Sequence, residues 1–208
     1  MTYFGFLAVF LGIPIIIFLL ITWNDSRKGM MIVGLKNGRA VWFAIALHIT
    51  VALIYTTPWD NYLVATGVWY YDPDLVTGVL IGYVPIEEYT FFIAETLLTG
   101  LWWWFLARRI LVGKPFSPSG RLRTLSTLAL LSLWVISLSY LVSGWQPATY
   151  LAITLVWALP PIGLQFAFGA DILWRHIRLV TLSIIPMTIY LSLADSLAIT
   201  SGTWTIDP

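Results

Sequence analysis

Two adjacent glutamates, Glu87 and Glu88, stand immediately before a long apolar and aromatic run. A third carboxylate, Glu95, is the only charged residue between positions 89 and 107, a stretch long enough to cross a bilayer as a helix. Carboxylates at the mouth of a membrane helix and inside it are costly to place there, so their presence indicates a function.

The spacing of these carboxylates suits acid–base chemistry. On a helix Glu88 and Glu95 share one face, whereas Glu87 lies about 100° round the axis. Two close carboxyl groups tend to share one proton, which provides an acid and a base in one place. Such a pair can protonate an alkene, and aromatic faces can stabilise the resulting carbocation. We therefore expect chemistry on a lipid-soluble substrate, with four candidate catalytic residues: Glu87, Glu88, Asp60 and Glu95.

Aromatic residues gather before and after the glutamate pair. Those nearest the carboxylates, together with one aspartate that recurs in a repeat, are the candidates for substrate contact: Trp59, Trp69, Tyr83, Phe91, Phe92 and Asp195. For the aromatics the alternative is an ordinary belt at the membrane–water interface. For the glutamate pair it is an acidic helix cap, and for Glu95 it is pairing with a buried polar group such as His48.

The composition is that of an integral membrane protein. Of 208 residues, 59% are hydrophobic and only 10% are charged, with a mean hydropathy of +0.86. A soluble domain has roughly 25% charged residues. The net charge of +1 predicts no nucleic-acid partner, and the absence of cysteine excludes thiolate metal sites and thiol catalysis. No glycine-rich phosphate fingerprint or H-E-x-x-H cluster occurs, so we expect no cofactor and no metal.

Six apolar segments of spanning length are predicted as transmembrane helices. They cover Tyr3–Thr22, Ala40–Thr57, Tyr89–Ala107, Thr124–Ser143, Ala148–Phe168 and Ile177–Leu197. The first segment lacks a basic region and a small-residue cleavage site, so we interpret it as a mature helix and not a signal peptide. The second loop is predicted to begin at Pro58 and to end at Pro85.

The basic residues lie only in the first, third and fifth loops. These loops contain all 11 Lys and Arg residues: Arg27, Lys28, Lys36, Arg39, Arg108, Arg109, Lys114, Arg121, Arg123, Arg175 and Arg178. The positive-inside rule therefore predicts that these loops are cytoplasmic and that both termini lie outside.

An internal repeat organises the chain. Residues 60–73 align with residues 195–208 at a constant offset of 135, with identical Asp, Gly, Trp, Asp and Pro residues. The predicted fold is all-α and membrane-integral: six helices from a parallel three-plus-one-plus-three repeat whose seventh helix is missing. The predicted division is a first three-helix repeat over 1–107, a basic loop and linking helix over 108–147, and an incomplete second repeat over 148–208.

The sequence resembles the membrane-integral lycopene β-cyclases. The resemblance rests on Trp59–Tyr62, on Trp69–Tyr71 and on Gly82–Phe92, which contains the family's P-x-E-E/D motif as Pro85, Glu87 and Glu88. Members of that family occur as small heterodimeric subunits, as fused chains, and as the cyclase half of a fungal bifunctional protein with phytoene synthase.

The resemblance implies cyclisation of the linear ψ ends of lycopene to β-ionone rings, through γ-carotene to β-carotene. The reaction is an isomerisation, and Glu87 and Glu88 carry over as its acid–base candidates. Lycopene and γ-carotene are the implied substrates, the bilayer is the implied environment, and a partner subunit or phytoene synthase is the implied protein partner. The second acidic motif of fused members has no counterpart in this sequence.

Other functions remain open at this point. The same scaffold fits an ε-ring cyclase, a cyclase of C50 carotenoids or a γ-carotene-forming monocyclase. A small transporter also uses parallel three-helix repeats, but its site lies at the midplane, whereas the polar residues here gather toward one face. A membrane subunit without activity of its own is the third alternative.

Overall fold

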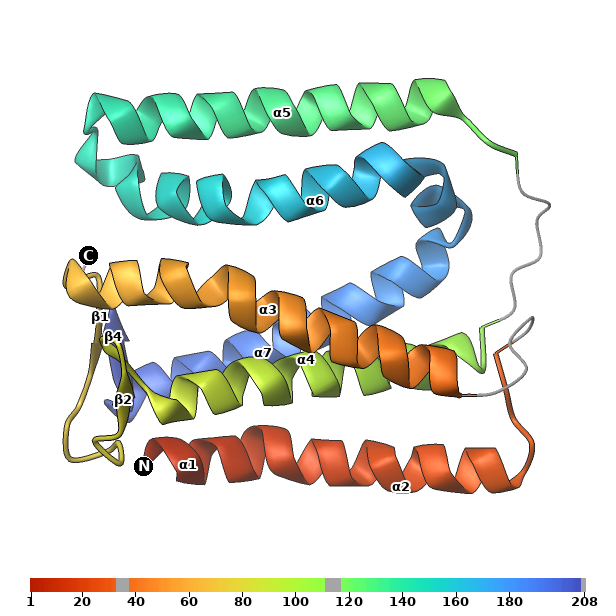
Figure 1. Ribbon diagram of the computed structural model, residues 1–208, viewed down its shortest axis with the longest axis horizontal. Coiled ribbons are helices and arrows are strands. Elements are labelled where there is room, and N and C mark those ends of the chain that lie inside the picture. Colours follow the sequence, from red (N-terminus) through yellow and green to blue (C-terminus); the bar gives the residue numbers. More distant parts are fainter. Residues whose placement is uncertain (33–37, 111–116, 207–208) are drawn as a thin grey trace. The chain divides into compact units, whose positions relative to one another are not determined.

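The computed structural model describes residues 1–32, 38–110 and 117–206 (Figure 1). Lys36, Lys114, Asp207 and Pro208, which the loop and repeat assignments use, lie outside the described residues. The chain forms two compact units, and each is described by itself. Unit 1 combines Met1–Leu111 with Thr181–Pro208, and unit 2 is Val112–Val180.

The helices confirm the membrane assignment, because six of those in the described part of the chain are long and apolar enough to span a bilayer. The first is continuous through α1 (Tyr3–Phe6), the π-helical η1 (Leu7–Gly12) and α2 (Ile13–Arg27). The others are α3 (Arg39–Ala65), α4 (Ile86–Ala107), α5 (Gly120–Ser143), α6 (Thr149–Arg175, preceded by the 3₁₀ turn η2, Gln146–Ala148) and α7 (Ile177–Thr200).

One predicted boundary is wrong. The second loop does not begin at Pro58, because α3 continues through this proline to Ala65. A proline inside a helix removes one hydrogen bond, which a membrane helix tolerates more readily than a soluble one. The helix ends instead at Ala65, just before Gly67, whose φ of 74° is the left-handed conformation typical of the residue after a helix end. Asp60 is therefore a helical residue and not a loop residue.

Prolines also determine how the first helix meets α7. Pro14 has no N–H to offer the carbonyl of Phe10, four residues earlier, and the helix has π geometry just before it. The Tyr190 hydroxyl of α7 donates to that Phe10 carbonyl at 2.8 Å. A side chain from a neighbouring helix thus replaces the hydrogen bond that the proline removes.

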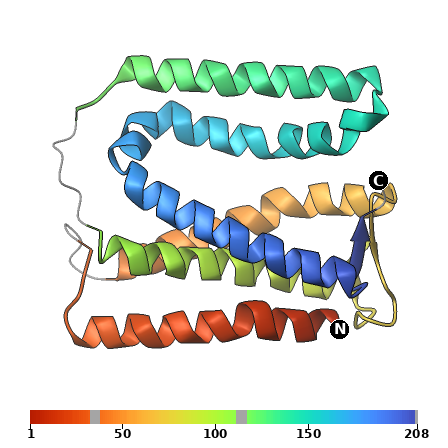
Figure 2. The ribbon, with the colours of Figure 1, turned by 180° about the vertical axis from the view of Figure 1, so that it is seen from behind.

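The same arrangement connects α4 to α7. Pro186 leaves the carbonyl of Leu182 without its helical donor, and the Trp102 indole N–H donates to this carbonyl at 3.0 Å. Figure 2, the view from behind, shows the course of α7 along unit 1. These two hydrogen bonds fix the position of α7 along the axes of the first helix and of α4.

The core of unit 1 lies on both faces of α4. One cluster joins the first helix, α4 and α7 through buried residues: Tyr3, Phe6, Leu7, Leu11, Leu98, Met187, Ala194 and Ala198. A second cluster joins α3 and α4 through Val41, Ile45, Leu101 and Trp104. Gly100 permits the close approach of α3, since a Cβ there would lie 2.9 Å from the Ile45 side chain.

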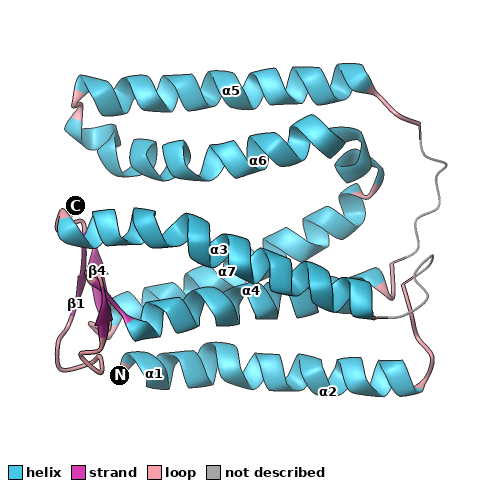
Figure 3. Cartoon of the chain, viewed as in Figure 1, coloured by secondary structure: helices cyan, strands magenta, loops and turns pink. Residues whose placement is uncertain are grey.

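Four short strands lie at one end of unit 1 (Figure 3). β1 (Trp69–Tyr71) pairs antiparallel with β4 (Trp204–Ile206), and Tyr70 is opposite Thr205. β2 (Leu80–Ile81) pairs antiparallel with β3 (Val84–Pro85). Tyr70 and Thr205 differ by 135 positions, the offset of the aligned blocks. The three-helix repeat as a whole stays a prediction.

Unit 2 is an antiparallel hairpin of α5 and α6 that turns at Gly144, whose φ is 68°. The Trp134 indole of α5 donates to the Val156 carbonyl of α6 at 3.0 Å, the carbonyl that Pro160 leaves without a helical donor. At the other end of the hairpin Asp171 pairs with Arg123 at 2.8 Å.

Candidate active site

A small hairpin positions the first turn of α4, which contains the two glutamates. Its turn residue Gly82 has a φ of 70°, and any Cβ there would overlap the side-chain oxygen of Asn61. Asn61 belongs to α3: its Oδ1 accepts from the Tyr83 N–H at 2.8 Å, and its Nδ2 donates to the Tyr89 hydroxyl at 3.1 Å. Asn61 therefore links the end of α3, the β2–β3 turn and the start of α4.

Glu88 is buried and accepts hydrogen bonds from two tyrosines that are distant in sequence. The Tyr3 hydroxyl comes from the start of the first helix, and the Tyr71 hydroxyl comes from β1. The two rings stack with centroids 6.1 Å apart and an angle of 16° between their planes. Burial, followed by the negative charges of Glu88 and Asp60, raises the pKa of Tyr71 well above its usual value. Tyr71 therefore remains protonated and acts as a donor.

Asp60 is a second buried carboxyl group, and its charge interacts with that of Glu88. Its side chain is fully buried, with 0% exposure, at the C-terminal end of α3. Within the described residues neither carboxylate oxygen of Asp60 has a hydrogen-bond partner. Asp60 therefore has no donor within the described residues, whereas Glu88 has two phenol donors.

Glu87 faces different surroundings from Glu88. Its Oε1 accepts from the Thr77 backbone N–H at 2.6 Å, so it holds the loop before β2. Its Oε2 is buried and has no hydrogen-bond partner in the part of the chain that the structure describes. Neighbouring positions on a helix point about 100° apart, so Glu87 and Glu88 contact different groups, and proton sharing between them stays a prediction.

Glu95 lies two turns beyond Glu88 on α4, and its charge interacts with the charges of Asp195 and Glu88. Asp195 belongs to α7 and accepts from the Trp204 indole N–H at 3.0 Å. Asp195 lines a groove of about 220 Å³ whose other walls are Phe6, Leu11, Phe91, Leu191, Ser192, Ala194 and Trp204. His48 is not a partner of Glu95: it is exposed, and its Nδ1 lies 2.7 Å from the Ala44 carbonyl oxygen of its own helix.

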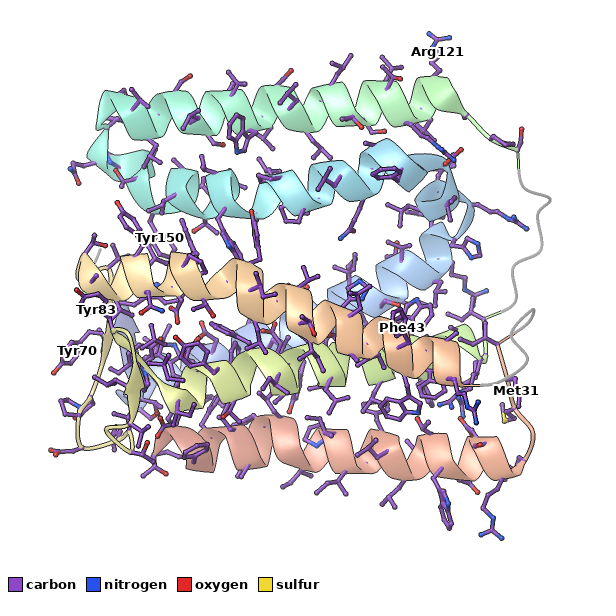
Figure 4. The ribbon with its side chains drawn as sticks, viewed as in Figure 1. Met31, Phe43, Tyr70, Tyr83, Arg121 and Tyr150 are labelled. Carbon is purple, nitrogen blue, oxygen red and sulfur yellow. The ribbon has the colours of Figure 1, made fainter. Side chains whose placement is uncertain are left out.

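The other aromatic candidates divide by burial. Tyr83 is 64% exposed and lies at the hairpin end of unit 1 in Figure 4. Trp59 and Trp69 are partly buried, and the Trp69 indole nitrogen lacks a hydrogen-bond partner among the described residues. Phe92 is buried and packs edge-to-face against Phe91, which lines the groove.

Several residues of the site had no signal in the sequence. Tyr3 looks like the first residue of an apolar helix, and Asn61 and Tyr71 lie in segments that carry the family resemblance but were not among the candidate site residues. Only the hydrogen bonds of Glu88 and of the hairpin single them out. No group of three His, Cys, Asp or Glu residues lies together in a metal-binding arrangement within the described residues.

Comparisons with known proteins place the chain in a family. It is 38% identical to a protein of Halobacterium salinarum named lycopene beta-cyclase, over 98% of this chain and 80% of that protein. It is 32% identical to a bifunctional lycopene cyclase/phytoene synthase of Podospora anserina, over 76% of this chain and 28% of the fungal protein. A protein of the same name from Aspergillus niger is also 32% identical, over 78% of this chain and 28% of its own length.

No family model matches the chain, and no solved structure does. The assignment therefore rests on whole-length sequence similarity to the archaeal protein, which this chain covers over four fifths of its length. Six apolar helices and a buried carboxyl cluster at the P-x-E-E motif are the structural context of that similarity. The chain belongs to the lycopene β-cyclase family.

Proposed function

We propose that this chain is a lycopene β-cyclase that converts the ψ ends of lycopene, and then of γ-carotene, to β rings. Two facts support the proposal: the family to which the chain belongs, and a set of buried carboxyl groups next to an aromatic groove. The reaction is an isomerisation, so it needs a proton donor, a proton acceptor and a water-poor cavity.

One face of α4 carries the main structural support. Glu88, Phe91 and Glu95 are three and then four residues apart, so a carboxyl, an aromatic ring and a second carboxyl follow each other along one face. Glu88 and Glu95 are therefore about 10 Å apart along the axis. Phe91, which lines the groove, therefore lies between two carboxyl groups on this face of α4, and Asp195 of α7 lines the same groove.

The two carboxyl pairs suit opposite roles. The first pair, Asp60 and Glu88, holds one proton between its two carboxyl groups, while Tyr3 and Tyr71 hold Glu88 in place. This pair supplies a proton to the less substituted carbon of the terminal alkene of the ψ end. The alkene electrons form the new C–H bond and leave a carbocation, which the internal alkene attacks to close the ring.

Proton loss completes the ring. The second pair, Glu95 with Asp195, removes a proton from the carbon next to the new cation, and that C–H electron pair becomes the ring double bond. One proton enters and one leaves, so no electrons are exchanged with a cofactor. Phe91 and Trp204, both lining the groove, present π faces that stabilise the cation between the two proton transfers.

The test is pigment analysis of cells that accumulate lycopene and express the chain. We expect β-carotene or γ-carotene to form, and Glu88→Gln to lower conversion by about a hundredfold because it removes the titratable proton. Asp74→Asn is the matched control, since Asp74 is exposed on the loop between β1 and β2. Unchanged lycopene at normal protein levels would refute the function, and an ε ring would refute the assigned proton loss.

The chain is a multi-pass membrane protein, and we propose its orientation and partners from the charges and the relatives. The basic loops are cytoplasmic and the termini lie outside, which follows from the loop distribution of Lys and Arg. The substrates reach the groove from the bilayer. The fungal relatives join both activities of their name in one polypeptide, so a separate phytoene synthase is the proposed pathway partner.

A further inference from the structure

A second pocket lies at the end of unit 1 opposite to the carboxyl cluster. It has a volume of about 470 Å³ and is bounded by the C-terminal part of α2, the start of α3 and the end of α4. The carboxyl cluster, in contrast, is formed by the other ends of the same helices. The cyclisation chemistry proposed above does not use this pocket.

Aromatic side chains form much of its wall. Trp42 of α3 meets Trp104 of α4 edge-to-face, with ring centroids 5.3 Å apart. A Cβ on Gly38 would lie 3.0 Å from the Trp104 ring, so the glycine allows this ring to reach the pocket. Trp23 and Met31 also line the pocket and are exposed; Met31 is labelled in Figure 4. This wall suits an apolar chain at the membrane interface, where tryptophan is enriched.

The polar part of the wall is cationic. Arg39 and Arg108 both line the pocket, together with the hydroxyl residues Thr22 and Ser26. The Arg108 side chain is only 1% exposed, and its Nε has no hydrogen-bond partner within the described residues. Arg108 also donates from Nη2 to the Thr22 hydroxyl at 3.1 Å, whereas Arg39 and Ser26 are exposed. Guanidinium groups in a pocket wall suit an anionic ligand.

The neighbouring acid does not cancel this charge. Asp25 is the single acidic residue at this end of the described unit 1, and it already pairs with Arg108 at 3.2 Å and with Arg109 at 2.9 Å. Arg27 and Lys28, which follow Ser26 directly in the sequence, add further positive charge near the pocket. The region therefore has a surplus of positive charge at the depth where lipid phosphates lie.

We propose that this pocket binds an anionic phospholipid. The lipid phosphate lies between Arg39, Ser26 and Arg108, and an acyl chain lies against Trp23 and the apolar residues of α2. Guanidinium groups bind phosphate with two donors. The aromatic wall favours a lipid over free soluble phosphate, because inorganic phosphate has no apolar part to pack against it. The proposal is independent of the cyclase assignment, because it concerns other residues.

The test uses the full chain purified in detergent and titrated with single lipids while native mass spectrometry counts the bound molecules. Phosphatidylglycerol is expected to bind about tenfold more tightly than phosphatidylcholine, which corresponds to one or two basic contacts. Ser26→Glu is expected to remove this preference, and Ser26→Gln, of equal size but neutral, is expected to keep it. Ser26 is exposed, so both variants are compatible with folding.

A second pair of variants tests the cation. Arg39→Gln is expected to weaken phosphatidylglycerol binding about fivefold. Arg121→Gln makes the same charge change at an exposed position of unit 2, which points outward in Figure 4, and is expected to leave binding unchanged. Equal binding of the two lipids, or equal behaviour of Ser26→Glu and Ser26→Gln, would overturn the proposal. Full displacement of the lipid by millimolar inorganic phosphate would also overturn it, by showing a site for soluble phosphate.

Discussion

Replacement of Tyr3 by phenylalanine isolates the hydrogen bond between the first helix and Glu88. The Tyr3 side chain is 1% exposed, and its ring packs on Tyr71 and, at 4.9 Å between centroids, on Trp204. Phenylalanine keeps these ring contacts and fills the same space. The variant therefore removes one O–H donor and leaves Glu88 with Tyr71 alone.

The expected effect follows from the charge of the acceptor. A hydrogen bond to a charged group contributes about 1.5–3 kcal/mol, and each 1.4 kcal/mol is a factor of ten. If the bond holds Glu88 in the orientation needed during proton transfer, Tyr3→Phe lowers the cyclisation rate by about 10- to 100-fold. The free energy of unfolding falls by no more than the same amount, so the fold is retained.

The assay is the conversion of lycopene by membranes that contain equal amounts of each variant, with thermal unfolding measured in detergent. Tyr70→Phe is the control, because Tyr70 is the neighbour of Tyr71 on β1 but is 58% exposed and points outward in Figure 4. Tyr70→Phe is expected to convert lycopene at the normal rate. If Tyr3→Phe is also within twofold of the normal rate, the reasoning that places Glu88 in the reaction is wrong.

Three further predictions concern the scaffold and the orientation. Gly82→Ala is expected to destabilise the protein more than Gly78→Ala, as measured by thermal melting curves. Both glycines have a positive φ, which costs about 1–2 kcal/mol for alanine, but a Cβ at Gly82 would also overlap Asn61. Trp102→Phe is expected to lower the free energy of unfolding by about 1–3 kcal/mol, because it removes the donor to the Leu182 carbonyl. In a Pro186→Ala background the backbone N–H of residue 186 can bond this carbonyl, so the loss is expected to be smaller. Equal losses in the two backgrounds would refute the role of the indole. A reporter fused after Pro208 is expected outside the cytoplasm, and cytoplasmic signal would contradict the orientation.

The sequence alone determined the class of protein and the region of the candidate site. Six helices follow from the lengths of the apolar runs, because a bilayer requires about 20 apolar residues per crossing. Glu87, Glu88 and Glu95 stood out because charge is expensive in an apolar run, and that cost is visible from local sequence. The end of the second helix was misplaced, since one proline does not stop a helix that neighbouring structure stabilises.

Only the tertiary structure decided which groups meet. Glu88 accepts a hydrogen bond from Tyr3, 85 positions away, and its charge interacts with that of Asp60, 28 positions away. Asp195 reaches the groove because α7 packs against the first helix, where Tyr190 replaces a hydrogen bond that a proline removed. Spacing along one helix fixes which side chains share a face, but which faces pack together depends on the shapes and hydrogen bonds of all the helices at once.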